Sequence, residues 1–286
     1  MVTVVVLLSL IATAFTPWAA ADDWDPYYNE DEYTAFYTPP NPLPPGQPGD
    51  LVRSEPSRLI LEPSGVVGNY NATGTRIMYR STDARGNPDV VTGTYFEPFN
   101  AWPGRGPRPL IVYGPGTQGQ GDQCAPSRQF NQGIHWSPYA DLMVNYEGAF
   151  VNTMVNRGFA VLMTDYEGLG TIGVTHTYVS RLSEGHAMLD AARVARKLPG
   201  TSLTPDGPVA FWGYSQGGGA SASAAELAGS YAPELNVVGS YAGAPVADLM
   251  ELFPYTDGSL LVGVVGYALN SVIQSYPEHE AEIRAV

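Results

Sequence analysis

Residues 209–229 read VAFWGYSQGGGASASAAELAG, and this stretch predicts a strand, a sharp turn and a helix in immediate succession. The short apolar run at residues 209–212 is typical of a buried strand, and the alanine-rich residues 216–229 favour a helix. Between them, Gly213, Ser215 and Gly217 form a G-x-S-x-G motif. Glycines around the serine remove side chains that would collide in such a turn, so the serine can adopt strained backbone angles. The motif therefore predicts that Ser215 is a nucleophile.

The start of the helix and an earlier glycine-rich loop are the expected sources of hydrogen-bond donors to an oxyanion. Backbone N–H groups at a helix N-terminus face developing negative charge, so we expect the N–H of Gln216 to be one donor. A second donor is expected from residues 113–121, YGPGTQGQG, which follow a predicted strand. Because Pro115 has no N–H, the candidates in this loop are Gly116, Thr117 and Gln118. The alternative is that these residues form only a flexible surface loop.

Alternating strands and helices place the motif in an α/β fold with a mostly parallel sheet. The predicted strands are residues 76–80, 90–96, 109–113, 158–163, 209–212 and 236–241, and the predicted helices are residues 147–156, 183–198 and 216–229. This alternation favours helices on both faces of the sheet. After residue 248 the chain becomes helical and apolar.

The first 50 residues are expected to lie outside this core. Residues 2–15 are apolar and precede three alanines at positions 19–21, a pattern typical of a cleaved secretory signal peptide over residues 1–21. A membrane anchor is the alternative, but the apolar run is short for a span. Residues 22–50 are acidic and then proline-rich, which predicts an extended arm. We therefore expect a secreted, extracellular protein without a stable membrane anchor.

Composition limits the possible partners. The chain has 286 residues, 44% of them hydrophobic, which is enough to bury one large core. Its formal net charge of -14 argues against nucleic-acid binding, because contacts to phosphates require a basic surface. Cys124 is the single cysteine of the sequence, so its thiol has no partner for a disulfide within this chain. The oligomeric state does not follow from the sequence.

Several motifs together resemble the secretory lipase family, a group of α/β-hydrolases. They are GPGTQGQGDQCAPS (114–127), DYEGLG (165–170), SEGHAMLDAARVAR (183–196), GYSQGG (213–218) and YAPELNVVGSYAGAPVADL (231–249). The resemblance implies an exported lipase or carboxylesterase that hydrolyses acylglycerols or related esters through an acyl-enzyme on Ser215. It also implies that no metal or organic cofactor is needed and that a helical lid covers the acyl site. Residues 51–249 would then form the hydrolase core, and residues 250–286 would begin the lid.

The resemblance further implies catalytic and disulfide partners that this sequence does not show. In the family, the cysteine at the place of Cys124 pairs with a cysteine well beyond the nucleophile, and the catalytic Asp and His follow the serine. The residues after Ser215 match only the next strand and the beginning of the lid. We therefore expect the last strands, the triad Asp and His, and the disulfide partner to be missing, as in a C-terminally truncated fragment or an interrupted gene. On this reading the chain as written is nearly inactive.

One histidine after the nucleophile could complete a triad within the sequence. His279 lies in a polar segment of the expected lid region, and Asp248 or Asp257 could orient it. It is therefore a possible, weakly supported general base.

Other titratable residues precede the nucleophile. His135 and His176 lie in predicted loops and could line a substrate cleft, whereas His186 lies in a predicted helix and is expected to be packed or solvated. Asp165 and Glu167 follow a predicted strand, and we interpret them as a turn that hydrogen-bonds its own backbone.

Two other functions are compatible with the sequence. The same fold supports other acyl-transfer serine enzymes, such as a peptidase or an acyltransferase, and fold alone does not separate these activities. The third possibility is a catalytically inactive remnant that still binds acyl chains. Acyl-chain length and positional preference are not encoded in any motif identified here.

Overall fold

The computed structural model describes residues 35–61, 64, 66, 68–137, 141–259 and 261–285. The signal peptide expected over residues 1–21 and the first part of the expected arm lie outside the described residues. The second part of the arm packs against the core. Phe36 and Tyr37 are buried together with Met78 and Val90, and the Tyr37 hydroxyl lies 2.6 Å from Ser127 Oγ.

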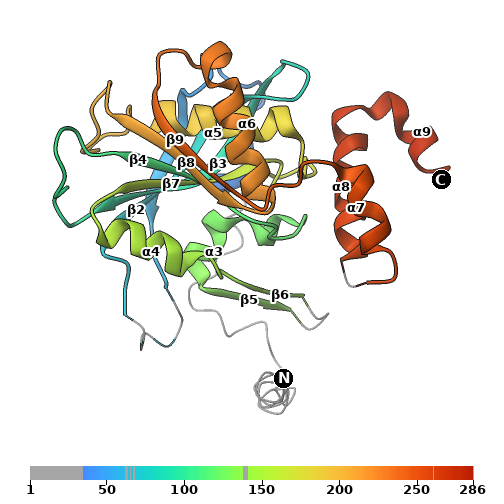
Figure 1. Ribbon diagram of the computed structural model, residues 1–286, viewed down its shortest axis with the longest axis horizontal. Coiled ribbons are helices and arrows are strands. Elements are labelled where there is room, and N and C mark those ends of the chain that lie inside the picture. The colour runs from blue at the N-terminus through green and yellow to red at the C-terminus, as the bar shows by residue number, and fades with distance from the viewer. Residues whose placement is uncertain are drawn as a thin grey trace.

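Seven strands form the main sheet, in the order β1-β2-β3-β7-β4-β8-β9 (Figure 1). Their bounds are β1 Leu51–Ser57, β2 Ala72–Thr82, β3 Pro88–Pro98, β4 Leu110–Gly114, β7 Ala160–Glu167, β8 Pro208–Tyr214 and β9 Asn236–Gly243. The pairs β1–β2, β2–β3 and β3–β7 are antiparallel. The pairs β7–β4, β4–β8 and β8–β9 are parallel. The α/β fold class is confirmed, with an antiparallel half that includes one strand, β1, absent from the sequence prediction.

Helices cover both faces of the sheet, as the alternation of elements predicts. One face carries α3 (Pro126–Gln132) and α4 (Gly148–Asn156), whose apolar side chains pack with those of β3, β4 and β7. The other carries α5 (Arg181–Ala195) and α6 (Gln216–Tyr231) over a larger core. All eight residues of β7 are buried, because this central strand is covered on both sides.

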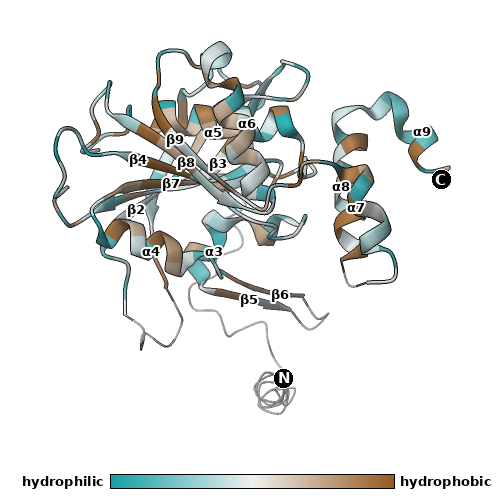
Figure 2. Cartoon of the chain, viewed as in Figure 1, coloured by the Kyte–Doolittle hydropathy of each residue, from teal (hydrophilic) through white to brown (hydrophobic). Residues whose placement is uncertain are grey.

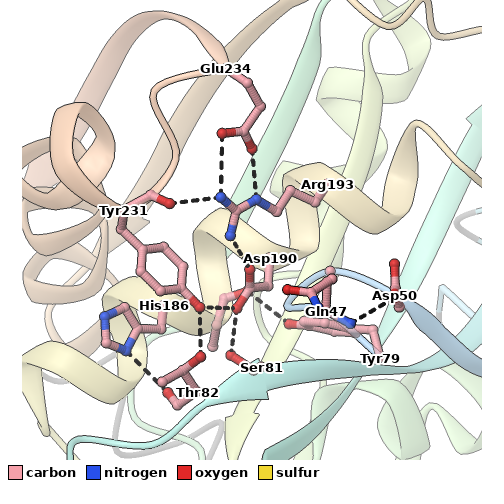
Figure 3. A network of polar contacts seen from close by, with 12 residues as sticks. Gln47, Asp50, Tyr79, Ser81, Thr82, His186, Asp190, Arg193, Tyr231 and Glu234 are labelled. Carbon is pink, nitrogen blue, oxygen red and sulfur yellow. Dashed lines mark hydrogen bonds and ion pairs between the residues drawn. The ribbon is translucent and has the colours of Figure 1, made fainter. Parts of the chain in front are cut away.

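A polar cluster ties α5 and α6 to the antiparallel half of the sheet (Figure 3). Asp190 of α5 accepts hydrogen bonds from Ser81 Oγ at 2.9 Å and from the Tyr231 hydroxyl at 2.8 Å, and it pairs with Arg193 at 2.8 Å. His186 stacks on Tyr231 with ring centroids 4.2 Å apart. These contacts agree with the expectation that His186 is a packed helix residue.

A small hairpin lies beside the main sheet. It consists of β5 (Ile134–Ser137) and β6 (Asp141–Val144), which pair in antiparallel orientation. His135 therefore lies on a strand opposite Met143, and the prediction that it belongs to a loop is wrong. The hairpin was not anticipated, because each of its strands has only four residues.

The last described elements are helical and lie to one side of the sheet (Figure 1, red). They are α7 (Leu249–Thr256), α8 (Val262–Ser275), the 3-10 turn η3 (Pro277–His279) and the short α9 (Glu280–Ile283). Gln120 links α8 to the core, because its Nε2 donates to the Tyr267 carbonyl at 3.1 Å and its Oε1 accepts from Asn270 at 2.9 Å. A further 3-10 turn, η2 (Asp122–Cys124), follows this glutamine.

Candidate active site

Ser215 lies at the turn between β8 and α6, in a backbone conformation that few residues adopt. Its φ is 58° and its ψ is -118°. A positive φ in a non-glycine residue is strained and persists only where the surroundings impose it. Here the Ser215 N–H donates to the Gly243 carbonyl of β9 at 2.9 Å, and the Ser215 carbonyl accepts the first helical bond from Gly219 at 3.0 Å. The neighbouring strand and the helix together hold the serine in this conformation.

The glycines of the motif are required by the close approach of backbone segments. A Cβ on Gly213 would lie 2.1 Å from the Gly217 carbonyl oxygen, and one on Gly217 would lie 1.9 Å from that of Gly114. A Cβ on Gly218 would lie 2.2 Å from the Gly243 oxygen. The collisions predicted for side chains at Gly213 and Gly217 are therefore found in the structure. Gly218 is a third position at which a Cβ would collide with backbone.

The side chain of Gln216 belongs to a buried polar cluster behind the nucleophile. Its Nε2 donates to Glu184 Oε1 at 2.8 Å and lies 2.9 Å from His176 Nε2. The other ring nitrogen of His176, Nδ1, lies 2.9 Å from the Glu167 carbonyl. Since a carbonyl only accepts, Nδ1 carries the proton and Nε2 accepts from Gln216.

His176 is thus neutral, and both of its ring nitrogens are hydrogen-bonded. Burial lowers its pKa to about 4, and its side chain is fully buried. The prediction that His176 could line a substrate cleft is wrong. Glu184, which was not singled out from the sequence, also accepts the Val179 N–H at 2.9 Å, and burial raises its pKa to about 8.

The glycine-rich loop after β4 lies beside the nucleophile turn. A Cβ on Gly217 would meet the carbonyl oxygens of Gly114 and Pro115 at 1.9 and 2.9 Å, and a Cβ on Gly116 would lie 3.3 Å from the Tyr214 oxygen. This is the side of the sheet that an oxyanion-binding loop must occupy.

The N–H of Gly116, however, is already used. It donates to both carboxylate oxygens of Glu147, at 3.0 and 3.2 Å. The assignment of Gly116 as an oxyanion donor is therefore corrected, because an N–H directed at a buried carboxylate does not face substrate. Thr117 and Gln118 remain the loop candidates.

Glu147 is a residue of this site that the sequence did not reveal. It directly precedes α4 and is only 4% exposed. Burial raises its pKa to about 7, although hydrogen bonds from Gly116, Tyr113 and Gln118 oppose that rise. No local motif marks this glutamate, since its partner Gly116 is 31 positions away in the chain.

His279 is not assembled into a triad by the described residues. It lies in η3, half-exposed, with Nδ1 3.2 Å from Glu282 Oε2 of the following turn. Asp248, a proposed partner, instead accepts the N–H groups of Met250 and Glu251 at 2.8 and 3.3 Å. Asp257 is exposed at the end of α7. The prediction that His279 could serve as the base therefore gains no support from these contacts.

Asp165 and Glu167 lie within β7 and bind other segments of the chain. Asp165 accepts Thr92 Oγ1 at 2.6 Å and the Ser127 N–H at 2.9 Å, so it joins β3 and α3 to β7. Glu167 accepts Thr177 Oγ1 at 3.0 Å. The interpretation of these residues as a self-bonded turn is wrong, because the strand continues through Glu167.

The structure also bears on the cysteine, on metal binding and on membrane-spanning helices. Cys124 is buried in η2 against Ala125 and Leu169. Within the described ranges, no group of three or more His, Cys, Asp or Glu side chains could hold a metal ion. Over the same part of the chain, none of the helices has the length and apolarity that a membrane crossing requires.

Comparison with known proteins gives consistent matches. The family model described as secretory lipase matches residues 135–285. A Mycobacterium tuberculosis protein named a probable inactive lipase is 31% identical over 242 residues, which cover 85% of this chain and 52% of that protein. Lipase 5 of Candida albicans is 30% identical over 257 residues, which cover 87% of this chain and 52% of that protein.

A solved structure supports the fold assignment. The closed state of Candida antarctica lipase A superimposes with a TM-score of 0.72 at 23% identity, covering 87% of this chain and 54% of that one. At this identity the similarity establishes the fold alone. The chain spans about half the length of the curated relatives it matches.

Proposed function

Because the chain belongs to the secretory lipase family, we propose that it contributes to hydrolysis of carboxylic esters through an acyl-enzyme on Ser215. The observation that carries this proposal is the strained conformation of Ser215 at the end of a parallel strand, held by β9 and α6. A serine presented on such a turn projects its hydroxyl beyond the sheet edge, where a substrate can reach it.

The chemistry follows from the groups around this turn. Ser215 Oγ attacks the ester carbonyl carbon, and negative charge develops on the carbonyl oxygen. The N–H of Gln216, at the start of α6, and the N–H of Thr117 in the adjacent loop are the proposed oxyanion donors. Collapse of the intermediate releases the alcohol and leaves an acyl group on Ser215, which water then removes.

This reaction needs a histidine base oriented by a carboxylate. His176 is excluded from that role by its two hydrogen bonds, and His186 by its place in the cluster on Tyr231. We therefore assign neither of these two histidines as the base.

The proposed substrates are acylglycerols or related lipid esters, and the proposed location is extracellular. The α7–α8 segment supports a lipid substrate, because it contains many hydrophobic residues (Figure 2) and large apolar side chains such as Met250, Tyr255 and Leu269 are exposed there. A small cavity beside it is lined by Tyr178 and Val179 and by Leu249 and Val264 of the segment. We propose that this segment begins a lid over the acyl site.

A second candidate is a catalytically inactive member of the family. One observation favours it: the name of the Mycobacterium tuberculosis relative. Such a protein would keep the nucleophile turn without turnover.

Labelling and turnover separate the two candidates. The full-length protein and its Ser215→Ala variant are treated with a fluorophosphonate probe and assayed on p-nitrophenyl esters of graded chain length, with a peptide panel in parallel. Labelling and ester hydrolysis that both disappear in Ser215→Ala support the hydrolase. A folded full-length wild-type protein that neither labels nor hydrolyses supports the inactive candidate, and labelling that survives the substitution removes Ser215 from the mechanism.

A further inference from the structure

The buried carboxylate of Glu147 is surrounded by donors from the loop beside the nucleophile. It accepts the Gly116 N–H at 3.0 and 3.2 Å, Gln118 Nε2 at 3.0 Å and the Tyr113 hydroxyl at 3.2 Å. Two of these three donors belong to the loop, and the third, Tyr113, is the second-last residue of β4. No cationic partner for this carboxylate is found among the described contacts, so the donors alone compensate its burial.

We propose that Glu147 is a positioning residue, which fixes residues 116–118 beside Ser215 and determines which N–H of that loop faces the substrate oxygen. This inference rests on the function proposed for Ser215. By taking the Gly116 N–H, Glu147 leaves the next N–H along the loop, that of Thr117, as the donor to the oxyanion.

The residue next to Glu147 holds the same loop from another side. The Tyr146 hydroxyl donates to the Thr117 carbonyl at 3.0 Å, and Thr117 Oγ1 lies 2.8 Å from the Tyr178 hydroxyl. The turn at residues 146–147 therefore holds the two peptide groups that flank the Gly116–Thr117 peptide, one through the Gly116 N–H and the other through the Thr117 carbonyl. Restraints on both sides of this peptide, and on the Thr117 side chain, limit its rotation, and an oxyanion donor needs a defined orientation before the reaction begins.

A carboxylate suits this position better than an amide. Its two oxygens accept all three donors, whereas glutamine has one oxygen and would turn an NH2 group toward a donor. The Glu147→Gln variant keeps the size of the side chain but breaks at least one loop contact. We therefore expect the loop to open more often while the rest of the fold is retained.

The chain offers a matched control at the opposite edge of the sheet. Glu97, near the end of β3, accepts the Tyr95 hydroxyl at 2.6 Å, the Ser202 N–H at 3.0 Å and Ser202 Oγ at 2.6 Å. Like Glu147, it binds one tyrosine and a neighbouring loop. Glu97→Gln makes the same chemical change away from the nucleophile.

Amide hydrogen exchange measures the loop without requiring turnover. In Glu147→Gln we expect exchange over residues 114–120 to accelerate about 10-fold or more, as for the loss of one charged hydrogen bond of 1.5–3 kcal/mol. In Glu97→Gln that segment should exchange as in wild type. Unchanged exchange of residues 114–120 in folded Glu147→Gln overturns the proposal. If that variant does not fold, Gln118→Ala, which removes one loop donor, must accelerate the same segment, and failure to do so overturns it equally.

Kinetics on the full-length protein test the catalytic part of the inference. A displaced oxyanion donor acts on the transition state, so Glu147→Gln should lower kcat by about 10- to 100-fold with little change in KM. Accelerated loop exchange with an unchanged kcat would overturn the positioning role. A wild-type protein without esterase activity would refute the proposed function, and the exchange experiment would still decide the contact between Glu147 and the loop.

Discussion

Replacing Gly217 with alanine tests the packing of the nucleophile turn most directly. The added Cβ would lie 1.9 Å from the Gly114 oxygen, 2.6 Å from the Gly114 carbonyl carbon and 2.9 Å from the Pro115 oxygen. All three atoms are backbone, so no side-chain rotation relieves the contact. Either the end of β4 or the start of α6 must move.

The free energy of unfolding follows from two opposing effects. Alanine is favoured over glycine within a helix by about 0.5 to 1 kcal/mol, whereas overpacking costs about 1 to 3 kcal/mol and sometimes more. Because the contact is with rigid backbone, we take about 3 kcal/mol for that cost. Gly217→Ala should therefore lower the free energy of unfolding by about 2 to 2.5 kcal/mol.

Gly219→Ala is the matched control, two residues further along the same helix. Its Cβ would have no neighbour closer than 3.9 Å, and neither glycine has a positive φ. This variant should be neutral or more stable by about 0.5 kcal/mol. With an m-value of about 2 to 3 kcal/mol per molar urea, the two unfolding midpoints should differ by about 0.7 to 1.5 M. Midpoints that agree within a few tenths of a molar unit would refute the steric explanation of the motif.

Three further outcomes are expected. Glu184→Gln should gain stability relative to wild type as the pH rises from 5 to 8. Burial raises the pKa of Glu184 to about 8 in the folded protein, whereas the unfolded carboxyl ionises near its ordinary pKa, so across this range wild-type folding must take up a proton and loses stability as the pH rises. Urea midpoints that differ by a constant amount across this range would contradict it. Asp165→Ala should lower the free energy of unfolding by about 3 kcal/mol, because it leaves donors from β3 and α3 unsatisfied. Asp257→Ala, at an exposed position, should leave the urea midpoint unchanged. Equal losses of stability in the two variants would argue against the buried network. Finally, His279→Ala should not change the rate of fluorophosphonate labelling of Ser215, and a large decrease would restore His279 as a candidate base.

The nucleophile turn could be recognised from the sequence because its determinants are adjacent in the chain. A buried strand, three small residues around a serine and an alanine-rich helix follow one another within residues 209–229. The glycines that permit such a turn are visible in the local sequence, although two of the backbone groups that they accommodate, the carbonyls of Gly114 and Gly243, come from other strands. The central strands and the helices on both faces were predictable for the same reason, since apolar periodicity reports which local segments are buried.

The partners of the polar groups were decided only by the tertiary structure. Gly116 and Glu147 are 31 positions apart, His176 and Gln216 are 40 apart, and Ser127 and Asp165 are 38 apart. A buried donor or acceptor must be paired, but its own sequence context does not say with which group. Which N–H faces the substrate, and which histidine is already engaged, therefore depends on how the strands are ordered in the sheet and on which side each helix packs.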